Sequence, residues 1–302
     1  MSRSRARRAP PRGTPSDRND RTARRVASAA FAFVVLLVTF WVGLPALVPI
    51  YLALAGLAIF EYAAMLRLRA VRVHRTALLV ATVAHVPVAL PADHPLSIQA
   101  MLSIPAREAL GLAFLLAILT IALRRPHRDA LATVGYTLLG YLWIPAFFSY
   151  LLTLRVSPDP AIGLATLLLP ALAAVASDVG GWTFGRALGR RPLSPDLSPD
   201  KTIEGAIGGL ALAAVVTPAV AWALAAWGPG APISPAWALP FGLLVAFAAQ
   251  VGDLFESLVK RWAGVKDAGL FLPGQGGVLD RIDSHLFALP LAYLVLTLGG
   301  AL

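Results

Sequence analysis

The sequence has no cysteine among its 302 residues. That absence excludes disulfides, zinc–thiolate sites and cysteine nucleophiles. Charged residues are scarce as well, at 14% of the chain, whereas about 25% is usual in soluble domains. Lysine is the rarest charged residue, with three lysines beside 23 arginines. So little charge is not typical of a soluble domain.

Hydrophobic residues take the place of charged ones: they make up 58% of the chain and form runs of about twenty residues. Each run is long enough to cross a roughly 30 Å hydrocarbon core as a helix. We therefore expect an all-α polytopic membrane protein with about nine transmembrane helices. The expected spans are residues 27–43, 45–65, 76–91, 107–123, 131–154, 160–177, 203–227, 237–258 and 283–300. The third is short, which favours a tilted or partly re-entrant helix.

The basic residues predict the orientation. Nine of the 26 lie in residues 1–25, a segment rich in Arg, Pro and Ser that has almost nothing to bury. We expect a disordered cytoplasmic tail, either near anionic lipid headgroups or simply flanking the first span, and no nucleic-acid partner. With this tail in the cytoplasm, only Arg107 and Arg155 fall in external segments. The positive-inside rule then predicts a cytoplasmic N-terminus and an external C-terminus.

The acidic residues are concentrated in the last part of the chain. Nine of the sixteen lie between Asp178 and Asp283: Asp178, Asp196, Asp200, Glu204, Asp253, Glu256, Asp267, Asp280 and Asp283. Carboxylates near the hydrocarbon boundary are costly unless they face a cavity, a cation or a partner charge. We therefore expect one integral domain, residues 26–302, with a helical scaffold at about 26–170 and a catalytic part at about 171–302.

Two acidic groups have the spacing of one helix face. Asp253, Glu256 and Lys260 are spaced i, i+3, i+7, the pattern of a site or of an ion pair that closes a helix end. Asp280 and Asp283 are again spaced i, i+3, where the last span should begin. Such oxygen ligands suit Mg²⁺, which also keeps waters and substrate phosphates, although a helix N-terminus favours acids without any metal. We prefer the metal interpretation because a glycine-rich loop joins the two groups.

That loop contains PGQGG, residues 273–277, whose glycines allow the close backbone approach that a phosphate-holding loop needs. Alone this is a weak signal, because glycine turns are common, and the same caution applies to the glycines of SDVGGWTFGRALGRR, residues 177–191. SPDKTIEG, residues 198–205, predicts a helix entry with Thr202 as its cap.

The three lysines complete the pattern, because all of them fall in this polar part: Lys201, Lys260 and Lys266. A compact ammonium is suited to a phosphate in a way that Arg does not reproduce. Acidic metal ligands, lysines and glycine turns at a membrane surface predict phosphoryl or nucleotidyl transfer to a lipid. Elsewhere, we expect His85 and Glu61, within or at the edge of spans, to be paired or snorkelling groups.

One long motif resembles a known family. SLVKRWAGVKDAGLFLPGQGGVLDRID, residues 257–283, closely resembles the signature of the phosphatidate cytidylyltransferases, also called CDP-diglyceride synthetases. That signature reads Ser, two residues, Lys-Arg, four residues, Lys-Asp, then Pro-Gly-His-Gly-Gly, two residues, Asp-Arg, one residue and Asp. GDLFES, SPDKTIEG and the segment from Asp178 to Arg186 also resemble the family in order and spacing. The resemblance covers about residues 170–300.

This resemblance implies transfer of the cytidylyl group of CTP to phosphatidic acid, giving CDP-diacylglycerol and pyrophosphate for phospholipid synthesis. A phosphatidate oxygen would attack the α-phosphorus of CTP in line. The resemblance also implies Mg²⁺, with a monovalent cation such as K⁺ sometimes beside it. We expect a bacterial cell (inner) membrane, a site facing the cytoplasm, contacts with membrane lipids, and a homodimer as the candidate assembly.

The resemblance also implies roles for individual residues. Asp253 and Asp280 are the implied metal ligands, with Asp283 as a further ligand or a close neighbour of one. The residues implied in catalysis are Asp253, Lys260, Lys266, Asp280 and Asp283. Those implied in binding CTP or the lipid phosphate, together with Lys260 and Lys266, are Asp178, Ser198, Lys201, Arg261, Gly274, Gln275, Gly276, Gly277 and Arg281. One position departs from the family pattern, since the His is Gln275 here, which forms hydrogen bonds but does not titrate. The departure bears on the need for a titrating group or on the identity of the lipid acceptor.

Three other functions fit parts of the pattern. A cytidylyltransferase for a different lipid phosphate would share every motif. An ion-coupled transporter would suit many spans with intramembrane acids, but the acids crowd at one face and the halves show no obvious repeat. A CDP-alcohol phosphotransferase would carry DGxxAR followed by two spaced aspartates, which the sequence lacks.

Overall fold

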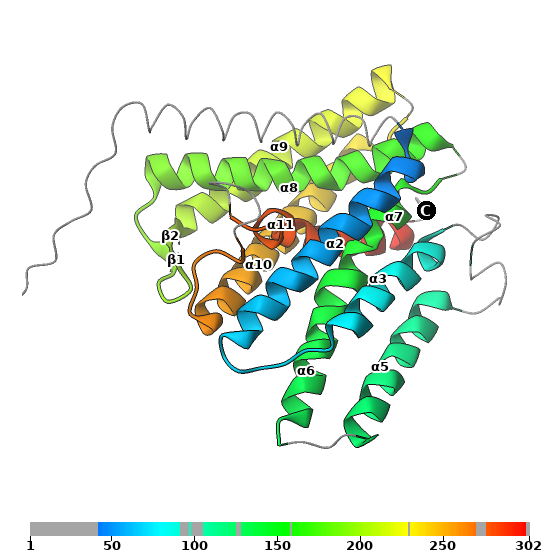
Figure 1. Cartoon of the computed structure of the whole chain (residues 1–302). Coiled ribbons are helices and arrows are strands. Elements are labelled where there is room, and N and C mark those ends of the chain that lie inside the picture. The colour runs from blue at the N-terminus through cyan, green and yellow to red at the C-terminus, as the bar shows by residue number, and fades with distance from the viewer. Residues whose placement is uncertain are drawn as a thin grey trace, which may run out of the picture.

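The computed structural model describes residues 42–90, 97, 105–124, 128–157, 159–228, 230–269 and 276–299, and these are almost all helical (Figure 1). The elements in chain order are α2 (Leu44–Arg67), α3 (Arg75–Ala89), α5 (Ala106–Arg124), α6 (Ala130–Tyr141), the π-helical turn η1 (Leu142–Ala146), α7 (Tyr150–Arg155), α8 (Pro160–Leu188), β1 (Pro192–Ser194), β2 (Ser198–Thr202), α9 (Ile203–Trp227), α10 (Pro235–Ala263) and α11 (Leu279–Leu298). The all-α prediction is confirmed, with one addition. Between α8 and α9, β1 and β2 form an antiparallel hairpin.

Seven stretches of the described chain are long and apolar enough to cross a membrane: α2, α5, the run from α6 to α7, α8, α9, α10 and α11. The protein is therefore an integral membrane protein. Helix α3 is apolar but has only 15 residues, which agrees with the short third span expected. The first expected span, 27–43, lies almost wholly outside the described residues, as does the basic tail. The total of nine spans and the orientation of the two ends stay predictions.

Helix α8 is longer than predicted. The expected span ended at residue 177, but the helix continues to Leu188. Its glycines allow α8 and α9 to approach closely, because a Cβ on Gly180 would lie 2.7 Å from the Gly208 carbonyl oxygen and one on Gly205 would lie 2.7 Å from that of Gly181. Small residues at such contacts are typical of membrane helices. Gly180, Gly181 and Gly185 therefore lie within a helix, where they allow α8 to pack against α9.

The helices after residue 160 form a bundle in which α8, α9, α10 and α11 pack on one another, and α2 contacts both α10 and α11. Two buried tyrosines fix α2 against its other neighbours. The Tyr51 hydroxyl donates to the Pro145 carbonyl at 3.1 Å, in the turn η1 that contains this proline. The Tyr62 hydroxyl donates to the Tyr136 carbonyl at 2.8 Å. Helix α2 thus lies beside the bundle (Figure 1) and is hydrogen-bonded to η1 and α6.

The local sequence explains where α9 begins and where α10 ends. Helix α9 begins as predicted, because Thr202 Oγ1 accepts a hydrogen bond from the Gly205 amide at 3.1 Å. Helix α10 ends at Ala263 and is capped by Gly264, which has a left-handed φ of 81° that glycine adopts without strain. The Val265 amide then donates back to the Lys260 carbonyl at 3.0 Å. The chain leaves α10 sharply, next to the start of α11.

Candidate active site

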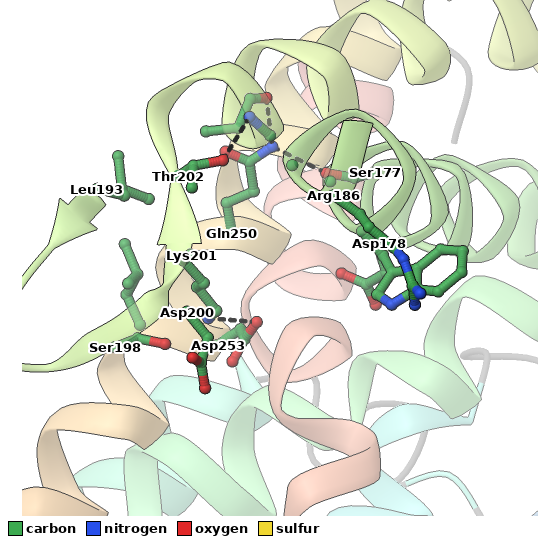
Figure 2. Close-up of a pocket in the computed structure, with 16 residues that line it drawn as sticks. Ser177, Asp178, Arg186, Leu193, Ser198, Asp200, Lys201, Thr202, Gln250 and Asp253 are labelled. Atoms are coloured by element: carbon green, nitrogen blue, oxygen red, sulfur yellow. Dashed lines mark hydrogen bonds and ion pairs between the residues drawn. The ribbon is translucent and has the colours of Figure 1, made fainter. Parts of the chain in front are cut away.

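A cavity of about 600 Å³ lies where α8, β2, α9 and α10 meet (Figure 2). Its polar lining includes Asp178 of α8, Ser198 and Lys201 of β2, and Asp253 of α10. These four residues were all predicted to belong to the site. Their convergence from three elements, in a volume within the range of about 300–1,000 Å³ usual for ligand pockets, makes this the candidate substrate pocket.

Lys201 and Asp253 form an ion pair across the cavity, marked by a dashed line in Figure 2. Their side chains are 29% and 30% exposed, so a ligand has access to both. The pair joins the hairpin to α10, although the two residues lie far apart in the sequence. It places an ammonium group where an anionic ligand would enter.

Gln250 also lines the cavity and was not predicted. Its Nε2 donates to Ser177 Oγ and to the Ala206 carbonyl, both at 3.0 Å. One amide thereby joins α10 to α8 and α9. The available signal was a polar amide side chain inside an apolar span, which is rarely accidental in a membrane protein.

Asp253 also belongs to a group of three carboxylates, the acidic triad, with Glu256 and Asp283. One oxygen from each lies within 4.8 Å of the others. Glu256 and Asp283 are only 1% and 7% exposed, and Glu256 Oε1 has no hydrogen-bond partner among the described residues. Carboxylates this close repel one another unless a cation lies between them, and their oxygens are the donors that Mg²⁺ prefers. The acidic triad therefore fits a divalent cation.

Lys260 lies between the triad and Asp280. Its Nζ is 2.5 Å from Glu256 Oε2 and 2.6 Å from Asp280 Oδ1. The other oxygen of Asp280 accepts hydrogen bonds from the amides of Ala268 at 2.9 Å and Gly277 at 2.7 Å. Asp280, which was predicted as a ligand, is thus engaged by protein groups and is not in the triad, where Glu256 lies instead. Its role as a metal ligand stays a prediction.

The remaining predicted residues lie around this centre. Arg261 is exposed, and its Nε donates to the Leu197 carbonyl at 3.0 Å, which attaches the hairpin loop to α10. Lys266 and Arg281 are also exposed. Arg261, Lys266 and Arg281 do not line the cavity described above. Gly276 has a left-handed φ of 88°, and Gly277 donates its amide to Asp280. Gly274 and Gln275 lie outside the described residues.

Glu61 of α2 binds the beginning of α11. Its two carboxylate oxygens accept hydrogen bonds from the amides of Val278, at 2.9 Å, and Leu279, at 2.8 Å. The expectation that Glu61 is a paired group is confirmed. Its partners lie 217 and 218 positions away, and no local signal in the sequence identifies them.

Known proteins provide an independent comparison. The model of the cytidylyltransferase family matches residues 23–298. The phosphatidate cytidylyltransferase of Bacillus subtilis is 38% identical over 165 residues, which cover 55% of this chain and 59% of that protein. A protein of the same name from Mycobacterium leprae is 40% identical over 173 residues, covering 57% and 51% of the two chains. The phosphatidate cytidylyltransferase of Staphylococcus saprophyticus is 32% identical over 195 residues, which cover 63% of this chain and 68% of that protein. The chain thus spans about half the length of several curated relatives that it matches.

Proposed function

The chain belongs to the cytidylyltransferase family, and we propose that it transfers the cytidylyl group of CTP to phosphatidic acid, releasing CDP-diacylglycerol and pyrophosphate. The names of its relatives support these substrates. The observation that carries the proposal is the position of Asp253, which belongs both to the cavity wall, paired with Lys201, and to the acidic triad. A cation for phosphate oxygens beside acids for a divalent metal is what nucleotidyl transfer requires.

Each group in the site has a role in this reaction. Mg²⁺ is the metal we propose for Asp253, Glu256 and Asp283, and when bound it stabilises negative charge on phosphate oxygens as a Lewis acid. Lys201 binds a phosphate oxygen of CTP, since its ammonium faces the cavity. We assign Asp280 to holding the backbone at Ala268 and Gly277, because both of its oxygens already have partners.

The covalent step needs no strong base. An anionic oxygen of phosphatidic acid attacks the α-phosphorus of CTP, and the bond from that phosphorus to the oxygen bridging to the β-phosphorus breaks. Pyrophosphate leaves with the bridging oxygen and the electron pair of the broken bond. The chain's task is to hold the two anionic substrates in line, since positioning and charge stabilisation provide most of the catalysis in such reactions.

The setting of the reaction is also a proposal. The arginine distribution and the bacterial relatives support a bacterial cell membrane with the site facing the cytoplasm. K⁺ beside Mg²⁺ and a homodimer follow from the family resemblance. Gln275 in place of the family His is the observation that favours a second candidate function, cytidylyl transfer to a different lipid phosphate.

The decisive experiment uses the purified chain in detergent with Mg²⁺, phosphatidic acid and CTP radiolabelled at the α-phosphate. We expect label in the lipid fraction as CDP-diacylglycerol, whereas CTP labelled at the γ-phosphate should give only labelled pyrophosphate. Asp253→Asn should give no labelled lipid. Label that appears only with another lipid phosphate would establish the second candidate. No labelled lipid with any lipid phosphate would reject the enzyme.

A further inference from the structure

The end of α2 contacts both of the helix ends that border the site. Glu61, near the end of α2, binds the first turn of α11 through Val278 and Leu279. Arg69, just beyond α2, donates from Nε to the Trp262 carbonyl at 2.5 Å, in the last turn of α10. Residues at and just beyond the end of α2 thereby bind both the last turn of α10 and the first turn of α11.

The charges of these two residues match the helix ends that they bind. The N-terminus of a helix carries partial positive charge and favours a carboxylate, and the C-terminus carries partial negative charge and favours a guanidinium. Val278 and Leu279 are 2% and 0% exposed, so water does not replace the carboxylate. Val278, at the N-cap position of α11, provides no side-chain cap of its own. Glu61 is the group that satisfies these two amides.

The backbone closes tightly around the Glu61 carboxylate. A Cβ on Gly269 would lie 2.4 Å from Glu61 Oε1, and one on Gly277 would lie 2.6 Å from the same oxygen. Any side chain at these positions would displace the carboxylate. The two glycines, one on each side of residues 270–275, thus have a role as neighbours of Glu61.

The first turn of α11 is also where the chemistry of the site begins. Asp280 directly follows the two amides that Glu61 binds, and Asp283 lies one turn further and belongs to the acidic triad. The other two triad members are on α10. The distance across the triad therefore depends on how α11 is placed against α10, and Glu61 binds the first turn of α11 from α2.

We infer that Glu61, assisted by Arg69, is a positioning residue that holds the first turn of α11 so that Asp283 meets Asp253 and Glu256. The kinetic part of this inference rests on the proposed function. Its structural part does not, because the backbone amides of α11 can be observed without substrate.

The test compares Glu61→Gln with the matched control Glu108→Gln, which changes an exposed acid in the first turn of α5. The Glu61 variant keeps the size of the side chain but loses its charge and one acceptor oxygen. A hydrogen bond to a charged group is lost, and we expect the KM for CTP and the Mg²⁺ concentration at half-maximal rate to rise about tenfold. Hydrogen exchange of the amides in residues 276–284, measured by mass spectrometry, should accelerate by a similar factor, and the control should change neither.

Arg69→Gln and its control Arg67→Gln test the other contact. Because Arg69 is exposed, we expect a smaller effect, about two- to fivefold faster exchange in residues 259–265 for Arg69→Gln alone.

A purely structural role for Glu61 predicts a different result, because fewer folded molecules lower kcat and leave the KM unchanged. A fall confined to kcat, with normal exchange in residues 276–284, would overturn the inference. If the parent protein makes no CDP-diacylglycerol, the proposed function fails, and the exchange measurement still decides whether Glu61 positions α11. Equal exchange in Glu61→Gln and the parent would reject the inference in either case.

Discussion

The ammonium of Lys260 lies 2.6 Å from a carboxylate oxygen of Asp280, although the two residues are 20 positions apart. The same ammonium is 2.5 Å from Glu256, and the side chains of Lys260, Asp280 and Glu256 are 12%, 10% and 1% exposed. One cation thus separates an acid that belongs to the acidic triad from an acid that holds the backbone before α11. It also fixes α11 to α10.

Replacing Lys260 by Met should strongly destabilise the protein. The substitution leaves two buried carboxylates without their cation, and breaking a buried pair in this way costs about 3–5 kcal/mol. Thermal unfolding in detergent measures the change. Lys266→Met is the matched control, because Lys266 is exposed and surface substitutions change stability by only about 0.5 kcal/mol. Equal unfolding temperatures for the two variants would contradict a central role of Lys260.

Mg²⁺ should stabilise the parent protein through the acidic triad. A ligand that binds only the folded state at 100 times its Kd contributes about 2.7 kcal/mol, so the unfolding temperature should rise on adding Mg²⁺ and fall again with a chelator. In Glu256→Gln this rise should shrink, and the chelated variant should be at least as stable as the parent because a buried, incompletely bonded charge is gone. Asp267→Asn, which removes an exposed acid nearby, should keep the full rise. A full rise in Glu256→Gln would exclude Glu256 from the metal site.

Asp280→Asn and Asp283→Asn should both reduce activity at least about 100-fold, but for different reasons. Asp283→Asn should raise the Mg²⁺ concentration needed for half-maximal rate, because it removes a triad member. Asp280→Asn should raise the KM for CTP and shift that concentration less than Asp283→Asn does, because it loosens the backbone at Gly277 and Ala268 and weakens the contact with Lys260 but removes no triad member. Steady-state rates over a Mg²⁺ series separate the two. A matching Mg²⁺ shift in both variants would make Asp280 a ligand, and retained turnover in Asp280→Asn would remove it from the site altogether.

The difference between Asp280 and Glu256 also marks how far the sequence could predict the site. Hydrophobic runs predicted the helices well, because a membrane span depends on composition and length alone. Helical spacing placed Asp253, Glu256 and Lys260 on one face, but spacing does not say which acid on a neighbouring helix that face meets. That choice depends on the register of α11 against α10, which Glu61 and Lys260 determine through contacts between distant residues. The sequence did not show that Gly180 and Gly181 lie in a helix, because a close helix contact and a turn both favour glycine.

Gln275 tests the one departure from the family motif. If a titrating group at this position assists the reaction, Gln275→His should raise kcat/KM with phosphatidic acid and add a pH dependence near the ordinary His pKa of about 6.5. Gln275→Ala should lower kcat/KM, because it removes the hydrogen-bonding groups of the amide. If both variants match the parent over the full pH series, Gln275 has no direct role.

The close contact of α8 and α9 should be sensitive to a single methyl group. In Gly180→Ala the added Cβ would lie 2.7 Å from the Gly208 carbonyl oxygen and 2.9 Å from Gly209 Cα, so the two helices must separate. Overpacking of this kind costs about 1–3 kcal/mol, and it should also raise the KM for CTP because both helices line the cavity.

Gly135→Ala is the matched control for that change. Gly135 lies in α6, and a Cβ there would meet nothing within 4 Å. The control should therefore gain the usual helix preference of Ala over Gly, about 0.5–1 kcal/mol, with no change in KM. The unfolding temperature and the KM for CTP, measured for both variants, test whether the close contact of α8 and α9 is needed. If Gly180→Ala is stabilised as much as Gly135→Ala, the close approach of α8 and α9 does not hold the cavity in shape.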